Sequence, residues 1–195
     1  MIKAKRKDKE KIIQILTKAF EQNPRVNDLV KQDSKRLHRI DRLMRYAYNV
    51  CSVFGKVLVS DDGKACALIL YPNRKQFSLK GVYWKMELLL GTVGFKSALK
   101  VLAREAFVSK HHERYSYYIW FMGVDSEYVN MGIGTDFMDE LIADADRRKR
   151  PIYLETHLPQ NLAWFEKFGF EVFREIKLDS PLYFLRRKSF HYFLK

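Results

Sequence analysis

The chain has 195 residues, of which 47% are hydrophobic and 30% charged, and its formal net charge is +13. This composition predicts a single globular domain with ample material for a core, and we see no internal repeat or low-complexity segment. No apolar run approaches the ~18 residues of a membrane helix, and the first residues lack the apolar stretch of a signal peptide. We therefore expect a cytoplasmic protein without a membrane partner.

The first part of the chain predicts a short edge strand and two helices. Residues 2–5 alternate apolar and charged side chains, as an edge strand does. Asp8 is the expected N-cap of a helix that ends at Asn23-Pro24, and Ser34 is the expected cap of a second helix. The apolar stripes of these two helices are Ile12, Ile13, Leu16 and Phe20, then Leu37, Ile40, Leu43, Met44, Ala47 and Val50.

A hairpin and an apolar insertion follow. Residues 56–60 and 65–71 predict two strands, joined by a turn in which Asp62-Gly63 supplies the positive φ that tight hairpins need. Residues 79–107 carry apolar side chains at helical spacing, so we expect an insertion of helices at about 76–113 within a single domain, 1–195. Packing against the sheet, a wall for an apolar part of a substrate and a homodimer contact are three interpretations of this insertion.

The most informative stretch joins a strand, a glycine loop and a helix. Residues 117–124 are rich in β-forming side chains, and residues 137–145 have helical periodicity. Gly132 and Gly134, between them, let the backbone approach a ligand closely. The first-turn N–H groups and the dipole of the helix favour an anion there, most simply a pyrophosphate. The alternative is a tight connection that binds nothing.

The remaining elements are a strand, a short helix and two final strands. Arg147–Arg150 place cations at the end of the preceding helix, where the dipole favours them, and Pro151 stops that helix. The expected elements are a strand at 152–156, a helix at 161–168 closed by Gly169, and strands at 171–178 and 182–188.

Two motifs in this region resemble the GNAT N-acetyltransferase superfamily. Residues 124–134 are similar to its acetyl-CoA loop, and Leu154-Glu155-Thr156 with residues 161–170 is similar to its second motif. Among its branches, the motifs resemble the puromycin N-acetyltransferase-like branch most. The resemblance implies an α/β fold with a GNAT-type mixed sheet of about six to seven strands, flanked by helices, with splayed central strands.

The resemblance also implies an acetyltransferase activity and a set of site residues. It implies transfer of an acetyl group from acetyl-CoA to an amine by direct attack in a ternary complex, without a metal. Asn161 would bond the pantetheine arm, and Phe165 would lie beside the thiol, where many relatives carry a proton-donating tyrosine. The residues implied for the rest of the donor are Met122, Val124, Val129, Asn130, Met131, Gly132, Ile133, Gly134 and Thr135.

Glu155 and His157 are the candidate general bases. A strand alternates its side chains, so both can face the same side, and an imidazole titrates near neutral pH. The alternatives are a loop-ordering role for Glu155 and a surface-loop position for His157. Because Phe165 has no proton to give, the thiolate would take one from water, Tyr118 or Tyr128.

Other function classes stay open at this point. An acyl-CoA-binding or interaction module of the same fold would fit Val129 and Phe165, which depart from the family pattern. The charge alone would fit a nucleic-acid-binding protein, although no nucleic-acid fold signature accompanies the cations. Phe137, at the third glycine position, argues against a dinucleotide-binding unit. Neither His111-His112 nor the two cysteines have the spacing of a zinc site. The acceptor amine is not identified.

Overall fold

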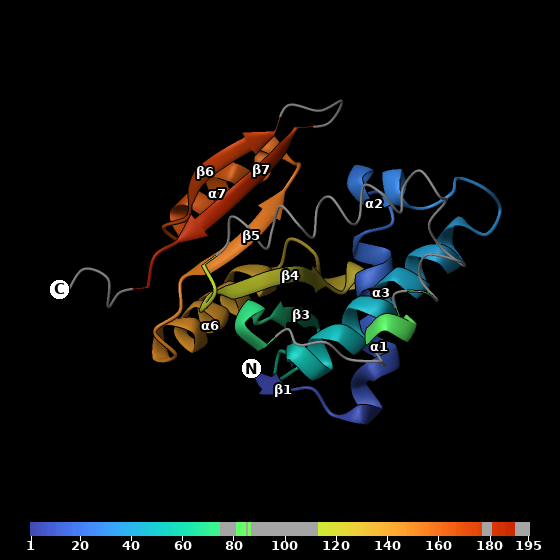
Figure 1. Cartoon of the computed structure of the whole chain (residues 1–195), viewed down its shortest axis with the longest axis horizontal. Coiled ribbons are helices and arrows are strands. Elements are labelled where there is room, and N and C mark those ends of the chain that lie inside the picture. The colour runs from blue at the N-terminus through green and yellow to red at the C-terminus, as the bar shows by residue number, and fades with distance from the viewer. Residues whose placement is uncertain (75–80, 85, 87–112, 177–180, 190–195) are drawn as a thin grey trace.

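The protein folds around a seven-stranded sheet with helices on both faces (Figure 1). This computed structural model describes residues 1–74, 81–84, 86, 113–176 and 181–189. Most of the expected helical insertion and the last two residues of the expected strand 171–178 therefore lie outside the described residues, although 81–84 and 86 are helical. The described strands are β1 (Ile2–Lys3), β2 (Gly55–Val59), β3 (Ala65–Leu70), β4 (Tyr117–Val124), β5 (Ile152–Thr156), β6 (Glu171–Ile176) and β7 (Leu182–Arg187).

The sheet is mixed, as the sequence predicts. Its strand order is β1-β2-β3-β4-β5-β7-β6, and every neighbouring pair is antiparallel except β4 and β5, which are parallel. The described α-helices around the sheet are α1 (Lys9–Ala19), α2 (Pro24–Leu29), α3 (Arg36–Phe54), α6 (Ile133–Arg147) and α7 (Leu162–Lys167).

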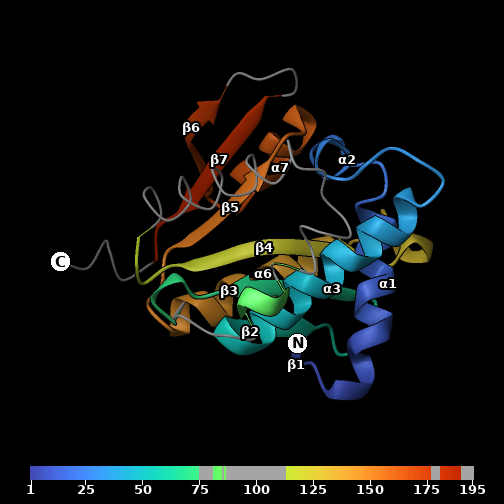
Figure 2. The ribbon, with the colours of Figure 1, turned by 45° about the vertical axis from the view of Figure 1, so that its right-hand side comes forward.

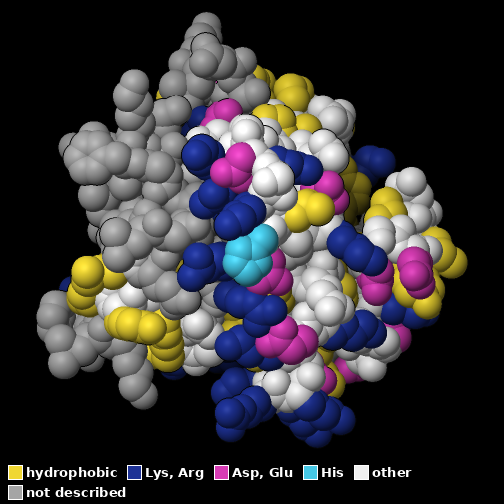
Figure 3. Space-filling model, turned by 90° about the vertical axis from the view of Figure 1, so that its right-hand side faces the viewer, with side chains coloured by type: hydrophobic (Ala, Val, Ile, Leu, Met, Phe, Trp, Pro, Cys, Tyr) yellow, Lys and Arg dark blue, Asp and Glu magenta, His cyan; other side chains and the backbone are white. Residues whose placement is uncertain are grey.

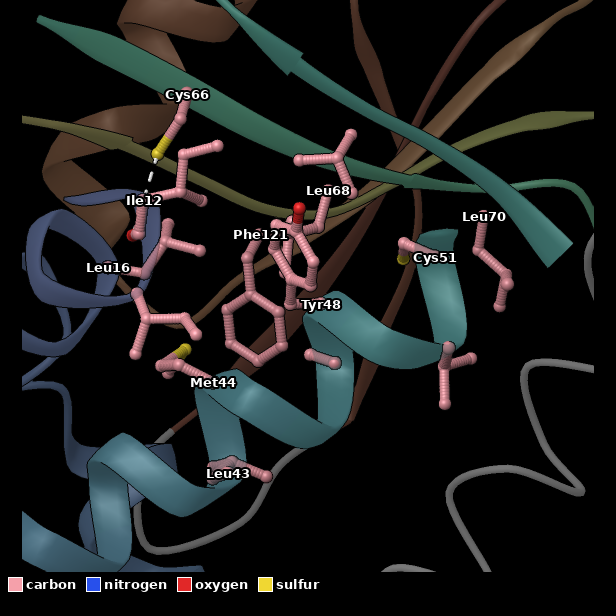
Figure 4. Packing of buried hydrophobic residues seen from close by; sticks show 14 of the residues in the cluster. Ile12, Leu16, Leu43, Met44, Tyr48, Cys51, Cys66, Leu68, Leu70 and Phe121 are labelled. Carbon is pink, nitrogen blue, oxygen red and sulfur yellow. Dashed lines mark hydrogen bonds between the residues drawn. The ribbon is translucent and has the colours of Figure 1, made fainter. Parts of the chain in front are cut away.

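Each face of the sheet has its own apolar cluster. The first cluster joins α1 and α3 to one face, and Figure 4 shows Met44 and Tyr48 of α3 next to Phe121 and Leu68. The second cluster joins α6 to the opposite face through buried side chains of Phe137, Met138, Leu141 and Ala145. Burial of these stripes is the main stabilising contribution, at about 25 cal/mol for each Å² of apolar surface.

Two of the expected helix boundaries are wrong. Asn23-Pro24 does not end α1, which stops at Ala19. Instead Asn23 caps α2, because its side-chain oxygen accepts a hydrogen bond from the Val26 N–H at 3.1 Å and Pro24 takes the first helical position. Lys35, not Ser34, precedes α3. Leu37, in the first turn of α3, is 48% exposed rather than part of the buried stripe.

Strand β4 contains an irregularity that changes which face its side chains cover. Ile119 pairs with Ile69 of β3, and Phe121 pairs with the neighbouring Leu68. Trp120 therefore has no partner of its own in β3 and forms a β-bulge. Before the bulge, Tyr118 packs with α1 and α3; after it, Met122 and Val124 pack on the face of α6. The bulge therefore turns the end of β4 toward the helix that follows the glycine loop.

Candidate functional site

Strands β4 and β5 part soon after they meet. They pair only at Tyr117↔Ile152 and Tyr118↔Tyr153. Beyond that point β4 stays paired with β3 and β5 stays paired with β7, so the two strands form a fork (Figures 1 and 2). This confirms the predicted splayed central strands. Within the fork, no described strand pairs with the backbone groups of β4 that point away from β3.

The glycine loop lies at the open end of β4. Asn130 and Gly132 have positive φ values of 65° and 82°, and the Gly132 carbonyl accepts hydrogen bonds from the N–H groups of Thr135 and Asp136. Within the described part of the chain, the N–H groups of residues 129–134 donate no hydrogen bond. Val129 and Met131 are 53% and 66% exposed. The loop thus presents backbone donors at a helix N-terminus, which fits the phosphates of a CoA.

Helix α7 lies beside the start of α6. The Trp164 indole N–H donates a hydrogen bond to Thr135 Oγ1 at 3.3 Å. Phe165 is half-buried, and its ring packs against Trp164 at 4.9 Å and Phe170 at 5.7 Å between centroids. Asn161 precedes α7, and its backbone N–H donates to the Leu158 carbonyl at 3.0 Å. The structure brings Trp164 to the loop helix, and sequence reasoning missed this residue.

The first candidate base, Glu155, lies across the fork from β4. Its Oε1 accepts a hydrogen bond from the Tyr118 hydroxyl at 2.7 Å, and Tyr118 is only 3% exposed. Tyr118 and Tyr153 belong to the cluster of α1 and α3, whereas Ile152 and Leu154 belong to that of α6. Glu155 therefore faces α1 and α3, so the fork separates it from the loop and α6 on the other face.

The second candidate base, His157, is buried rather than on a surface loop, with 8% of its surface exposed. Its Nε2 has no hydrogen-bond partner among the described residues. Burial, assisted by the charge of Arg25, lowers the pKa of His157 below 6.5, although Asp28 opposes this shift. Arg25 and Asp28 both belong to α2, a helix that the sequence analysis did not predict. The available signal was Asn23-Pro24, because asparagine is a favoured N-cap and proline is favoured at the first helical position.

The basic surface is partly neutralised on one side of the molecule. Figure 3 shows Lys and Arg side chains gathered in a band with carboxylates among them. Arg45 contacts Glu10 at 2.7 Å and Asp41 at 2.6 Å, and Arg39 contacts Asp33 at 2.8 Å. Several cations on this side of the molecule therefore have an anionic partner.

The described residues include no group of three or more His, Cys, Asp or Glu side chains that could hold a metal ion. Among the described helices, none combines the length and the apolar character that a membrane crossing requires.

The fold matches that of the GNAT acetyltransferases. Residues 87–170 match the model of the Acetyltransferase (GNAT) family, and this segment includes the glycine loop and the whole of the second motif. The family match and the fold together support an acetyltransferase of the GNAT superfamily. The particular branch within the superfamily stays a prediction.

Solved structures show the same fold at low sequence identity. One is described as histone acetyltransferase HPA2 and related acetyltransferase from Corynebacterium glutamicum, with 18% identity, a TM-score of 0.71 and coverage of 96% of this chain and 94% of that one. An N-acetyltransferase from Staphylococcus aureus has 12% identity, a TM-score of 0.56 and coverage of 94% and 97%. Ard1 from Thermoplasma volcanium has 14% identity, a TM-score of 0.51 and coverage of 96% and 95%.

Proposed function

We propose that the protein is an acetyl-CoA-dependent N-acyltransferase, in which the amine of an acceptor attacks the acetyl thioester directly in a ternary complex. The observation that carries this proposal is the fork between β4 and β5, which opens beside a loop of backbone donors. Neither feature needs a particular side chain at Val129, so the departure from the family pattern at that position is compatible with the proposal.

The chain has candidate groups for donor binding, for oxyanion stabilisation and for removal of the amine proton. The loop N–H groups of residues 129–134 would hold the pyrophosphate. Unpaired N–H groups of β4 at or near Val124 would stabilise the oxyanion. Glu155 or His157 would take the proton of the attacking amine, and His157 is suited to this because its lowered pKa keeps it neutral at pH 7.

The requirement with the weakest candidate in the protein is a proton donor for the departing thiolate. Phe165 stands where a proton donor would help, and its ring is packed against Trp164 and Phe170. A CoA thiol is acidic enough to leave at neutral pH with modest help, so the reaction is slower rather than blocked. The proton would come from water, Tyr118 or Tyr128.

A thiol-release assay with acetyl-CoA and a panel of small amines, amino-acid derivatives and peptides tests the proposal. We expect amine-dependent release of CoA, reduced about 100-fold or more by removal of the base in Glu155→Gln or His157→Gln. Binding of acetyl-CoA without turnover of any amine would instead identify an acyl-CoA-binding module of the same fold, which is the alternative that Phe165 favours.

A further inference from the structure

The segment that carries the glycine loop has an unfavourable charge for the ligand proposed there. Residues 125–136 contain three carboxylates, Asp125, Glu127 and Asp136, and no lysine or arginine. A CoA pyrophosphate is itself anionic, and like charges repel. The loop N–H groups and the helix dipole favour an anion, but they carry only partial charges. A full positive charge at this site can come only from another part of the chain.

The turn between β2 and β3 brings a lysine to this segment. The Lys64 ammonium lies 4.4 Å from the centroid of the Tyr128 ring, within the range of a cation–π contact. The Lys64 carbonyl accepts a hydrogen bond from the Asp125 N–H at 2.8 Å, and the Tyr128 N–H donates to the Asp125 carbonyl at 2.9 Å. Both the backbone and the side chain of Lys64 therefore contact the residues directly before the loop N–H groups of residues 129–134.

The Lys64 ammonium can bind a further anion. Its side chain is 34% exposed, and the nearer oxygen of Asp62, Oδ2, is 3.6 Å from Nζ. That distance is longer than the about 2.7–2.9 Å of a strong charge-assisted hydrogen bond. The other oxygen of Asp62, Oδ1, accepts bonds from the Ser60 hydroxyl at 2.6 Å and the Lys64 backbone N–H at 3.1 Å. An ammonium has three donors, so one long carboxylate contact leaves donors for a phosphate oxygen.

We infer that Lys64 is a donor-binding residue, whose ammonium neutralises the pyrophosphate of acetyl-CoA and whose contacts with Asp125 and Tyr128 hold the start of the loop. The inference rests on the proposed N-acyltransferase function and deepens it, because it adds a binding residue from outside the two motifs. A cation from the β2–β3 turn also needs no polar side chain at Val129, which departs from the family pattern.

The test compares Lys64→Met with Lys11→Met in calorimetric titrations of acetyl-CoA. Lys11 is the matched control, because its ammonium also lies at this turn, 3.3 Å from the position of a Cβ on Gly63, but it belongs to α1. Each variant removes one positive charge and keeps an unbranched apolar side chain. We expect the Kd of Lys64→Met to rise about tenfold, because a hydrogen bond to a charged group is lost. The Kd of Lys11→Met should change less than about twofold.

Three further arms separate the charge of Lys64 from a purely structural role. Lys64→Arg retains the charge and a cation–π contact with Tyr128, so its Kd should stay within about threefold of wild type. The deficit of Lys64→Met should narrow between about 0.1 M and about 1 M salt, because salt screens the interaction. Acetyl-dephospho-CoA, which lacks the 3′-phosphate but keeps the pyrophosphate, should show the same deficit as acetyl-CoA.

Four results would overturn the inference: equal Kd values for wild type and Lys64→Met, equal losses in Lys64→Met and Lys11→Met, a deficit that neither salt nor Lys64→Arg diminishes, or a deficit that vanishes with acetyl-dephospho-CoA. Failure of the proposed function has a different signature, namely no turnover of any amine by a wild-type protein that binds acetyl-CoA. The binding comparison then still decides the role of Lys64. A wild-type protein that does not bind acetyl-CoA would contradict both.

Discussion

Trp164 of α7 and Thr135 of α6 are joined by a hydrogen bond of 3.3 Å from the indole N–H to the threonine hydroxyl. The bond joins the helix that carries Phe165 to the first turn of the helix that follows the glycine loop. Trp164 also packs edge-on against Phe165 and Phe168, each at 4.9 Å between ring centroids. Thr135 and Trp164 are 29 residues apart in the chain. The two motifs that suggested a GNAT protein therefore meet as one structural unit beside the fork.

Replacement of Phe165 by tyrosine is expected to raise turnover. A phenol at this position would offer the departing thiolate a proton that the wild-type side chain lacks, and a general acid is worth about tenfold or more. Steady-state kcat for Phe165→Tyr, measured by thiol release, checks this. Phe168→Tyr is the control, because Phe168 is also half-buried and contacts Trp164. An unchanged or lower kcat in Phe165→Tyr would count against the proposed role.

Asp144 of α6 is expected to be important for stability. It is 6% exposed, and its carboxylate contacts Lys56 at 3.4 Å, Arg148 at 3.0 Å and the Tyr117 hydroxyl at 3.4 Å. Asp144→Asn leaves these groups without their anionic partner, so the free energy of unfolding should fall by about 3 kcal/mol at pH 7. Urea denaturation measures it. Asp146→Asn, which affects the more exposed pair with Arg187, should cost about 1 kcal/mol or less.

The contribution of Asp144 also has a predicted pH dependence. Burial raises its pKa, but the hydrogen bond from Arg148 and the charge of Lys56 together lower the pKa below its ordinary 3.8. The unfolded chain therefore binds this proton first on acidification. The stabilisation is complete above about pH 4 and is lost as the pH falls through the folded pKa. A difference between wild type and Asp144→Asn that does not shrink below about pH 4 would contradict this assignment.

His157 is expected to make stability rise with pH near neutrality. Because burial lowers its pKa below 6.5, the unfolded chain protonates first as the pH falls, and stability is lost below that value. Urea denaturation at about pH 5 and about pH 7.5 should show this loss in the wild type and a smaller one in His157→Gln. The exposed His38, changed to Gln, is the control and should leave the loss as it is. Equal losses in wild type and His157→Gln would be inconsistent with the buried imidazole.

Gly55 should tolerate no side chain. A Cβ at this position would lie 1.8 Å from the Ile69 carbonyl oxygen of the paired strand β3. Gly55→Ala should therefore lower the free energy of unfolding by about 3 kcal/mol. Gly134→Ala is the control, because its Cβ would meet Val124 Cγ2 at an ordinary 3.4 Å, and its stability should stay within about 1 kcal/mol of wild type. Similar losses in both variants would contradict the steric explanation.

Elements with strong local signals could be predicted from the sequence. The hairpin of β2 and β3 follows from Asp62-Gly63, and Gly63 has the expected positive φ of 70°. Strand β5 has the predicted bounds, Ile152–Thr156, because Pro151 and the end of α6 isolate it. Gly132 stands where the backbone needs a positive φ, so the loop before α6 was also recognisable.

Features set by register and tertiary packing could not be predicted. Helix α2 has six residues, too few for an apolar stripe, so the sequence pattern at Asn23-Pro24 predicts only the end of the preceding helix. The bulge at Trp120 leaves no sequence pattern, because it depends on how β4 pairs with β3. Tyr118 and Glu155 are 37 residues apart, and only the short parallel pairing of β4 with β5 brings them together.

Calorimetric titration of acetyl-CoA tests the central claim, that the loop before α6 binds the donor, most directly. We expect saturable binding by wild type and its loss in Gly132→Glu, which places a carboxylate among the loop N–H groups. Gly132→Asn is the matched control, because asparagine tolerates the φ of 82° and a Cβ there meets no atom within 4 Å, so binding should persist. No binding by wild type, or equal binding by wild type and Gly132→Glu, would contradict the account.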